Sequence, residues 1–270
     1  MLAYRTIAVD GTDVFYREGG EHRVPALLLL HGFPSSSAQY QSLMERLEGR
    51  YRVIAPDYPG FGQSAPLDGT TTFDRLVDAI DGFTNAIGLE RLSLYMFDFG
   101  SPVGFRLATR DPGRVQALVL QNGNAYEEGL GPGMQALRPY WRDREANEAA
   151  IRGFLQLDAT RSQYLDGVAD ASTVNPDLWE LDQRYLELPG RDQVMLDLLY
   201  DYQNNVELYP RWQEYLRANQ PPALLPWGST INSSRPRAHG PTSAICPRPS
   251  STSSTRATLR PRHTPRRSRG

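Results

Sequence analysis

Along the first 120 residues, short apolar runs alternate with segments in which apolar residues recur every three or four positions. Residues 26–30 contain no polar side chain, which predicts a strand buried on both faces. Leu76, Ile80 and Phe83 recur at helical spacing and predict an amphipathic helix. Strands and helices that alternate in this way predict an α/β fold, with a mostly parallel sheet and helices on both of its faces. The other strands predicted in this region cover residues 3–9, 13–17, 51–55, 92–97 and 115–120.

The pattern changes near Tyr126, and helical periodicity with many aromatic residues continues to about residue 220. No segment of this region resembles a strand, and the clearest helices cover residues 146–157, 192–202 and 209–218. We therefore expect residues 126–220 to form a helical cap over the carboxyl edge of the sheet. The core would consist of residues 1–125 and of a further strand within residues 221–228, where the strand pattern returns at 222–227.

Residues 229–270 differ in composition from the rest of the chain. They contain nine Arg residues, many Pro, Ser and Thr residues, and no acidic or aromatic residue. Residues 1–228 therefore hold 20 of the 29 basic residues and all 31 acidic residues, a net charge of −11. A segment of such composition cannot build a core, so we expect a disordered tail. Arg-rich tails can bind nucleic acid, but without aromatic side chains for base stacking we expect no nucleic-acid partner.

A sharp change of pattern falls at Asp98, where a predicted strand ends and small residues lead into a helical pattern. A tight strand-to-helix turn exposes its turn residue at the carboxyl edge of a sheet, and the nucleophile of an α/β-hydrolase occupies such a turn. A carboxylate there can attack an electrophilic carbon and form an ester intermediate. The alternative is that Asp98 only caps the following helix, as Asp often does.

Three motifs, in this order, resemble those of the α/β-hydrolase superfamily, in the branch that holds haloalkane dehalogenases and epoxide hydrolases. The resemblance covers residues 1–228 and implies an α/β-hydrolase fold with Asp98 as the nucleophile. It also implies that the backbone N–H groups of Phe33 and Phe99 face the developing oxyanion. The motifs are an oxyanion loop, His31-Gly32-Phe33-Pro34, a loop after the next strand, Asp57-Tyr58-Pro59-Gly60-Phe61-Gly62-Gln63-Ser64, and an aspartate elbow, Phe97-Asp98-Phe99-Gly100.

Within this branch, the resemblance favours an epoxide hydrolase. Haloalkane dehalogenases typically hold the halide with a Trp after the nucleophile and often with an Asn in the oxyanion loop. The corresponding residues here are Phe99 and Phe33, whose side chains donate no hydrogen bond. Epoxide hydrolases use cap tyrosines as donors to the epoxide oxygen, and Tyr202 and Tyr209 are our candidates for that role. A haloalkane dehalogenase-like hydrolase and a catalytically dead homologue remain the alternatives.

Hydrolysis of an ester on Asp98 requires a histidine base and an acid that orients it. Residues 1–228 contain only His22, in an early loop, and His31, for which a structural hydrogen-bonding role is expected. Read one base out of register, the codons of residues 254–259 can encode Asp-Thr-Gly-His-Phe, which resembles the family's sequence around its catalytic histidine. The same shift over residues 229–239 yields a sequence like the acid-bearing loop. We infer a frameshift near Gly228; the alternative is a natural basic tail.

The cysteine count and the length of the apolar segments bear on the location of the protein and on its partners. The single Cys246 excludes an internal disulfide and fits a reducing compartment. We find no signal peptide and no apolar segment long enough to cross a bilayer, so we expect a cytoplasmic protein without a membrane partner. The resemblance implies no metal or organic cofactor and a small apolar organic substrate. The oligomeric state is not readable from the sequence.

Overall fold

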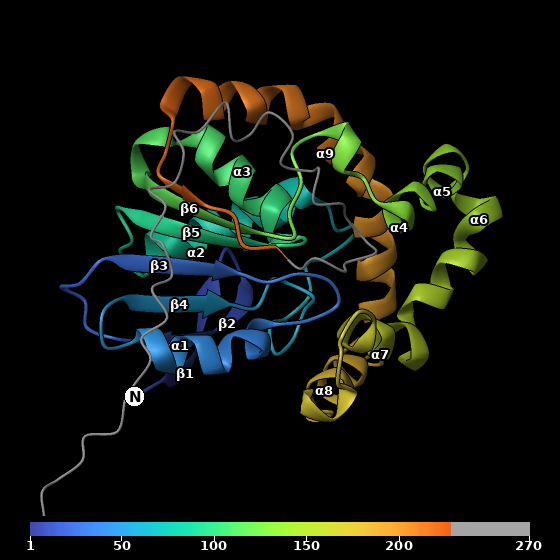
Figure 1. Ribbon diagram of the computed structural model, residues 1–270, viewed down its shortest axis with the longest axis horizontal. Helices are drawn as coiled ribbons and strands as arrows, with labels where there is room; N and C mark the ends of the chain where they lie inside the picture. Colours follow the sequence, from blue (N-terminus) through green and yellow to red (C-terminus); the bar gives the residue numbers. More distant parts are fainter. Residues whose placement is uncertain (228–270) are drawn as a thin grey trace, which may run out of the picture.

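The computed structural model describes residues 1–227, and a seven-stranded sheet in the order β1-β2-β4-β3-β5-β6-β7 forms its centre (Figure 1). β1 pairs antiparallel with β2, and β2 pairs antiparallel with β4, whereas every pair from β4 to β7 is parallel. The prediction of a mostly parallel α/β sheet is therefore confirmed. The strands are β1 (Ala3–Val9), β2 (Thr12–Gly19), β3 (Ala26–Leu30), β4 (Arg52–Pro56), β5 (Leu92–Phe97), β6 (Val115–Gln121) and β7 (Ala223–Leu224).

Strand β3 is entirely apolar because both of its faces are buried in hydrophobic cores. Its alternate residues Leu28 and Leu30 belong to the hydrophobic core under α2 (Phe73–Ala86) and α3 (Gly100–Arg110). Leu27 and Leu29 belong to a second core on the opposite face, which α1 (Gln41–Leu47) covers. Successive side chains of a strand point to opposite faces, so a strand covered on both faces has no position for a polar residue. The short 3₁₀ helix η1 (Ser37–Tyr40) adds Tyr40 to this second core, and the 3₁₀ helix η2 (Pro112–Arg114) precedes β6.

Residues 126–220 contribute helices to the structure. Figure 1 shows α4 to α8 beyond the ends of the parallel strands, while the long α9 returns across the core beside α3. We refer to the helices from η3 to α9 as the cap. They are η3 (Glu127–Gly129), α4 (Pro132–Gln135), α5 (Arg138–Arg142), α6 (Arg144–Ile151), η4 (Arg152–Leu155), α7 (Leu157–Leu165), η5 (Ala171–Thr173), α8 (Asp177–Leu186) and α9 (Arg191–Asn219).

Two helices predicted separately, at residues 192–202 and 209–218, form the single helix α9. Pro210 lies inside it, and a proline removes one helical hydrogen bond. The helix continues because Tyr209 and Trp212, on either side of Pro210, are both buried in the hydrophobic core. Packing of this face therefore outweighs the local break. The strand predicted at 222–227 is shorter than expected, since only Ala223–Leu224 pairs with β6.

Helix α9 also binds the start of α2. The carboxylate of Asp197 accepts a hydrogen bond from the backbone N–H of Thr71 (3.0 Å), and Asp201 accepts one from Phe73 (2.8 Å). Thr72 caps the same helix end, because its hydroxyl accepts from the N–H of Arg75 (3.3 Å). Backbone donors at a helix start have no partner within the helix, so these acidic side chains tie the cap to the core at a favourable position.

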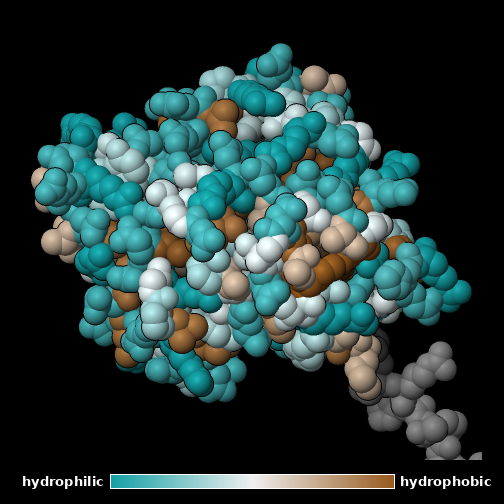
Figure 2. Space-filling view, turned by 180° about the vertical axis from the view of Figure 1, so that it is seen from behind, coloured by the Kyte–Doolittle hydropathy of each residue, from teal (hydrophilic) through white to brown (hydrophobic). Residues whose placement is uncertain are grey.

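Hydrophilic side chains cover most of the face that Figure 2 shows, and hydrophobic side chains lie there in separate groups. None of the helices within residues 1–227 combines the length and the apolar composition needed to cross a membrane. The expectations for the tail, residues 229–270, lie outside the described residues.

Candidate active site

Asp98 occupies the turn between β5 and α3, as the sequence predicted. β5 ends at Phe97 and α3 begins at Gly100, and the Asp98 backbone has a φ of +50°. The left-handed region is uncommon for residues with a side chain and occurs often at functional sites. The N-cap of α3 is Phe99, which makes no side-chain capping bond. The alternative that Asp98 only caps the helix is therefore wrong, and its carboxylate has other partners.

The oxyanion loop lies directly against this carboxylate. The backbone N–H of Phe33 donates a hydrogen bond of 2.8 Å to Oδ1 of Asp98, and the backbone N–H of Phe99 also interacts with the carboxylate. Burial raises the pKa of Asp98, while these two hydrogen bonds act in the opposite direction. The three predicted residues Phe33, Asp98 and Phe99 are thus brought together in the structure.

Gly32 makes this approach sterically feasible. A Cβ atom added at Gly32 would lie 2.5 Å from Cβ of Asp98 and 2.8 Å from its Oδ1. Any other residue would therefore push the loop away from the elbow and move the N–H of Phe33 from the carboxylate. The loop that follows β3 and the turn that follows β5 depend on this close contact.

Aromatic rings surround the elbow. Phe99 lies with its ring centroid 5.5 Å from that of Phe33, 5.1 Å from that of Phe73 and 6.0 Å from that of Tyr202. Tyr202 stacks in turn on Trp141 of α5, with the centroids 6.4 Å apart. These residues come from the oxyanion loop, the elbow, α2 and two cap helices. They form an apolar wall beside a carboxylate, an environment suited to an uncharged organic molecule.

The candidate tyrosines Tyr202 and Tyr209 both lie on α9, and both are buried. Their hydroxyl groups interact with each other, and burial raises the pKa of each. The negative charge of Asp98 raises the pKa of Tyr202 further. Nδ2 of Asn124 donates a hydrogen bond of 3.2 Å to the hydroxyl of Tyr209. Sequence reasoning did not single out Asn124; its position three residues after β6 was the one available signal.

His31 is buried and structural, as expected. Its Nε2 accepts a hydrogen bond of 3.2 Å from the backbone N–H of Tyr58, so Nδ1 carries the proton and donates to the carbonyl oxygen of Gly32 at 3.1 Å. Burial lowers the pKa of His31 to about 4, although the charge of Asp57 opposes this shift. Both nitrogens of the ring are occupied, so His31 has no free position for a water molecule.

The other described histidine, His22, lies on the surface, 3.9 Å from Glu18. Its side chain is 77% exposed, in the loop between β2 and β3. Within residues 1–227 the structure therefore places no histidine that could serve Asp98 as a base. His239 and His263 lie outside the described residues.

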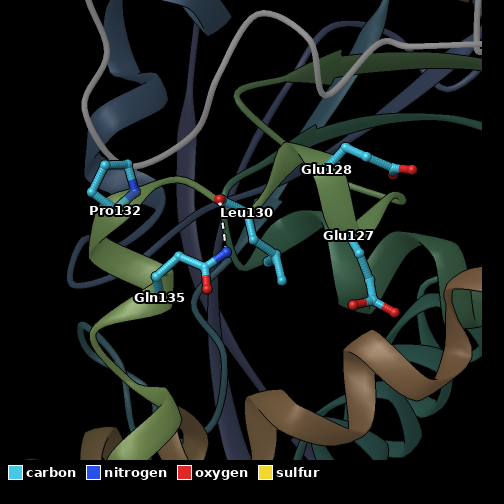
Figure 3. A pocket seen from close by; sticks show the side chains of 5 residues that line it. All are labelled: Glu127, Glu128, Leu130, Pro132 and Gln135. Atoms are coloured by element: carbon cyan, nitrogen blue, oxygen red, sulfur yellow. Dashed lines mark hydrogen bonds between the residues drawn. The ribbon is translucent and has the colours of Figure 1, made fainter.

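A surface hollow lies away from this site, at the start of the cap. Its lining comes from η3, α4 and the residues between them (Figure 3). Gln135 points across the hollow, and its Nε2 donates a hydrogen bond of 3.4 Å to the carbonyl oxygen of Leu130. None of the candidate site residues lines it. In the same part of the chain that the structure describes, no group of His, Cys, Asp and Glu side chains has the arrangement of a metal site.

Comparison with known proteins agrees with this architecture. The family model for the alpha/beta hydrolase fold matches residues 25–252. An uncharacterized hydrolase of Saccharomyces cerevisiae is 40% identical over 230 residues, which cover 82% of this chain and 78% of the yeast protein. A haloalkane dehalogenase of Bradyrhizobium diazoefficiens is 33% identical over 149 residues, 55% of this chain and 44% of the dehalogenase.

The similarity extends to solved structures. The crystal structure of a haloalkane dehalogenase from Bradyrhizobium elkani superposes with a TM-score of 0.73 at 22% identity, covering 92% of this chain and 88% of that one. At this identity the likeness concerns the fold. The family model, which covers more than half of the chain, shows that the chain belongs to the α/β-hydrolase superfamily.

Proposed function

We propose that Asp98 is a nucleophile that forms an ester with a small apolar organic substrate, and that the substrate is an epoxide. The hydrogen bond from the N–H of Phe33 to Oδ1 of Asp98 is the observation that carries this proposal. It holds one carboxylate oxygen and leaves Oδ2 available for attack. A buried carboxylate is also poorly solvated, which the raised pKa of Asp98 reflects, and poor solvation increases its reactivity toward carbon.

In the first step, Oδ2 of Asp98 attacks a ring carbon of the epoxide. The new C–O bond forms while the ring C–O bond breaks, and its electron pair remains on the former epoxide oxygen. That oxygen takes a proton from a cap tyrosine. Tyr202 is the better placed of the two candidates, because its ring contacts Phe99, next to the nucleophile, and its pKa responds to the charge of Asp98.

In the second step, water attacks Cγ of the ester, and the π electrons of its C=O bond move onto Oδ1. The N–H of Phe33, which already contacts Oδ1, and the N–H of Phe99 then stabilise the oxyanion. Collapse of this intermediate breaks the bond from Cγ to Oδ2, so that Oδ2 leaves with the product. This step needs a base to take a proton from water. Residues 1–227 supply the groups for the first step and for the oxyanion, but they supply no such base.

The haloalkane alternative shares the attack by Asp98 and differs in the leaving group. Relatives that carry the name haloalkane dehalogenase favour this alternative. The side chains of Phe33 and Phe99 favour the epoxide, because neither can donate a hydrogen bond to a halide. A tyrosine hydroxyl can hydrogen-bond a halide, but its acidic proton is most useful to a strongly basic alkoxide.

Intact-mass spectrometry tests the proposal with the full 270-residue chain. We expect incubation with a terminal epoxide to add the whole mass of the epoxide at Asp98, as peptide mapping would locate it. A 1-bromoalkane of equal carbon number serves as the comparison, since it would add an alkyl group and release bromide. The control is Asp98→Asn, which must lose the adduct; alkylation of Cys246 is recognised by its peptide. An unmodified Asp98 with both reagents would refute the proposal.

A further inference from the structure

His31 begins the oxyanion loop, and both nitrogens of its buried imidazole are hydrogen-bonded. The backbone N–H of Tyr58 can only donate, so Nε2, which lies 3.2 Å away, accepts from it. In the neutral ring the proton then lies on Nδ1, which donates to the carbonyl oxygen of Gly32 at 3.1 Å. The ring centroids of Tyr58 and Phe61 lie 4.1 Å and 5.2 Å from that of the imidazole. The loop that follows β4 therefore fixes both the orientation and the tautomer of His31.

The carbonyl group that receives this hydrogen bond belongs to the same peptide unit as the N–H of Phe33. That N–H donates in turn to Oδ1 of Asp98 at 2.8 Å. A peptide unit is planar, so a bond that holds its oxygen also fixes the direction of its N–H. Donation to the oxygen also makes the N–H a stronger donor, because hydrogen bonds in a row polarise one another. A row of three hydrogen bonds thus leads from Tyr58 through His31 and this peptide unit to Asp98.

A separate contact attaches the segment after the oxyanion loop to the loop that follows β4. The backbone N–H of Ser37 donates to Oδ1 of Asp57 at 2.7 Å, and the backbone N–H of Gln63 donates to Oδ2 at 2.8 Å. Asp57 is 1% exposed, and both of its carboxylate oxygens are used in this way. Because Asp57 already joins the two loops, the distinctive contribution of His31 is its bond to the peptide unit that carries the N–H of Phe33.

We propose that His31 is a positioning residue, whose Nδ1–H directs and strengthens the N–H of Phe33 as that group stabilises the oxyanion formed from the ester of Asp98. This inference rests on the proposed function. In this role His31 transfers no proton and acts only through the peptide unit. The burial that lowers its pKa to about 4 keeps the ring neutral at pH 7, which is the state in which Nε2 can accept.

Two substitutions separate the two hydrogen bonds of His31. In His31→Asn the side-chain amide reaches about as far as Nδ1, so it can still donate to Gly32 but cannot accept from Tyr58. In His31→Gln the amide reaches about as far as Nε2, so the acceptor is kept and the donor is lost. Each variant removes one buried hydrogen bond, and urea unfolding should show comparable losses of stability. A merely structural role predicts equal effects of the two variants on the chemistry, whereas the positioning role predicts unequal ones.

Cleavage of the ester by hydroxylamine measures stabilisation of the oxyanion, because this nucleophile needs no base from the protein. The full 270-residue chain is first loaded with the terminal epoxide. Hydroxylamine then attacks Cγ, the π electrons of the C=O bond move onto Oδ1, and Oδ2 leaves with the diol, so that a hydroxamate remains on residue 98. We expect the rate of adduct loss to fall at least about tenfold in His31→Gln and less than about threefold in His31→Asn.

Tyr40→Phe is the matched control for the loss of a buried hydrogen bond beside this row. It removes the bond of 2.8 Å from the tyrosine hydroxyl to the carbonyl oxygen of Leu30, the residue before His31. The variant should lose stability while its adduct reacts with hydroxylamine at the wild-type rate. Equal rates in the two His31 variants, or a slower rate in His31→Asn, would overturn the inference.

The direction of the row can also be measured without any change at His31 and without chemistry at Asp98. In a chain labelled with ¹⁵N-histidine, with Gln at the other three histidine positions, Nδ1 of His31 should give the signal of a protonated nitrogen and Nε2 that of an unprotonated one. The amide proton of Phe33, assigned with Phe33→Leu, should move upfield in His31→Gln and stay near its wild-type position in His31→Asn. The opposite tautomer would refute the row even in a chain that forms no adduct. The expected signals without any wild-type adduct would count against the proposed function alone.

Discussion

The backbone N–H of Phe33 and the carboxylate of Asp98 are joined by a hydrogen bond of 2.8 Å, although the two residues lie 65 positions apart in the sequence. Parallel pairing of β3 with β5 brings them together, because both residues follow the carboxyl ends of adjacent strands. In the mechanism that we propose, the same N–H group restrains Asp98 before attack and faces the oxyanion during hydrolysis. The predictions below concern this contact, the buried charges around it and the fate of the ester.

The substitution Gly32→Ala should separate the two residues. The added Cβ would lie 2.5 Å from Cβ of Asp98, a distance that requires the loop or the elbow to move. We expect a loss of roughly 2–3 kcal/mol in the free energy of unfolding and at least a tenfold slower alkylation of Asp98. Gly49→Ala, where no atom lies within 4 Å of the added Cβ, is the control and should change neither quantity appreciably. Equal behaviour of the two variants would argue against the close contact.

Asp98 itself should reduce the stability of the fold at neutral pH. Burial raises its pKa, so the folded state favours the protonated form more than the unfolded state does. The stability that this provides is present at low pH and is lost as the pH rises through the folded-state pKa. Asp98→Asn should therefore be more stable than the wild type at pH 7, and the difference should shrink as the pH falls. Urea unfolding followed by tryptophan fluorescence measures both, and a variant less stable at pH 7 would contradict the expectation.

A second buried carboxylate, Asp182 of α8, should add its own pH dependence. It is 2% exposed and accepts a hydrogen bond from the hydroxyl of Tyr164. Burial raises its pKa to about 6, and hydrogen bonds from Tyr164 and Ser35 oppose the shift. Between about pH 4 and pH 6 the folded state keeps a proton that the unfolded state releases, so the free energy of unfolding falls as the pH rises.

His31 acts in the opposite sense over the same range. Its pKa of about 4 means that only the unfolded state takes up the proton as the pH falls below about 6.5, so its contribution grows with rising pH. In the wild type these two opposite effects of pH on the free energy of unfolding partly cancel. The stability of a variant must therefore be compared with that of the wild type at each pH. Asp182→Asn should gain stability relative to the wild type as the pH rises from 4 to 7, on the order of 2 kcal/mol. A difference that stays constant with pH would exclude the raised pKa.

The elements that form the candidate site were predictable because short-range signals specify them. The buried run of β3, the small residues around Gly100 and the turn at Asp98 each impose a local geometry, and parallel pairing then aligns them. Asn124 escaped prediction because its partner Tyr209 is 85 residues away and nothing local marks it. The continuity of α9 was missed for a related reason: Pro210 signals a break, and only tertiary burial of Tyr209 and Trp212 overrides it.

Arg106 links α3, the helix after Asp98, to α2 and to the cap. Its Nε lies 2.7 Å from Oδ1 of Asp74, and its Nη1 donates to Asn205 of α9 and to the carbonyl oxygen of Pro102. The side chain of Arg106 is 6% exposed. Arg106→Met keeps much of the volume but leaves buried acceptors without a donor, so we expect a loss of roughly 3 kcal/mol.

Arg110 provides a matched control one helical turn later. It pairs with Asp78 of the same α2 helix at 2.8 Å, but the two side chains are 42% and 66% exposed. Exposed ion pairs contribute little, so Arg110→Met should cost less than about 1 kcal/mol. Denaturant unfolding of the two variants gives the comparison. Similar losses would mean that the bonds to Asn205 and Pro102 contribute little.

The last prediction is that the ester on Asp98 persists in the 270-residue chain. Within residues 1–227, His31 is occupied at both nitrogens and His22 lies on the surface, so no described histidine can activate water. We expect one equivalent of adduct that remains for hours. Resequencing the gene around codon 228 should reveal an added or missing base, and restoring the frame should give turnover. In heavy-oxygen water the restored enzyme should release a first product free of label and accumulate label in Asp98 over later cycles. Solvent oxygen in the first product would indicate direct attack by water, and sustained turnover by the 270-residue chain would show that a base has been overlooked.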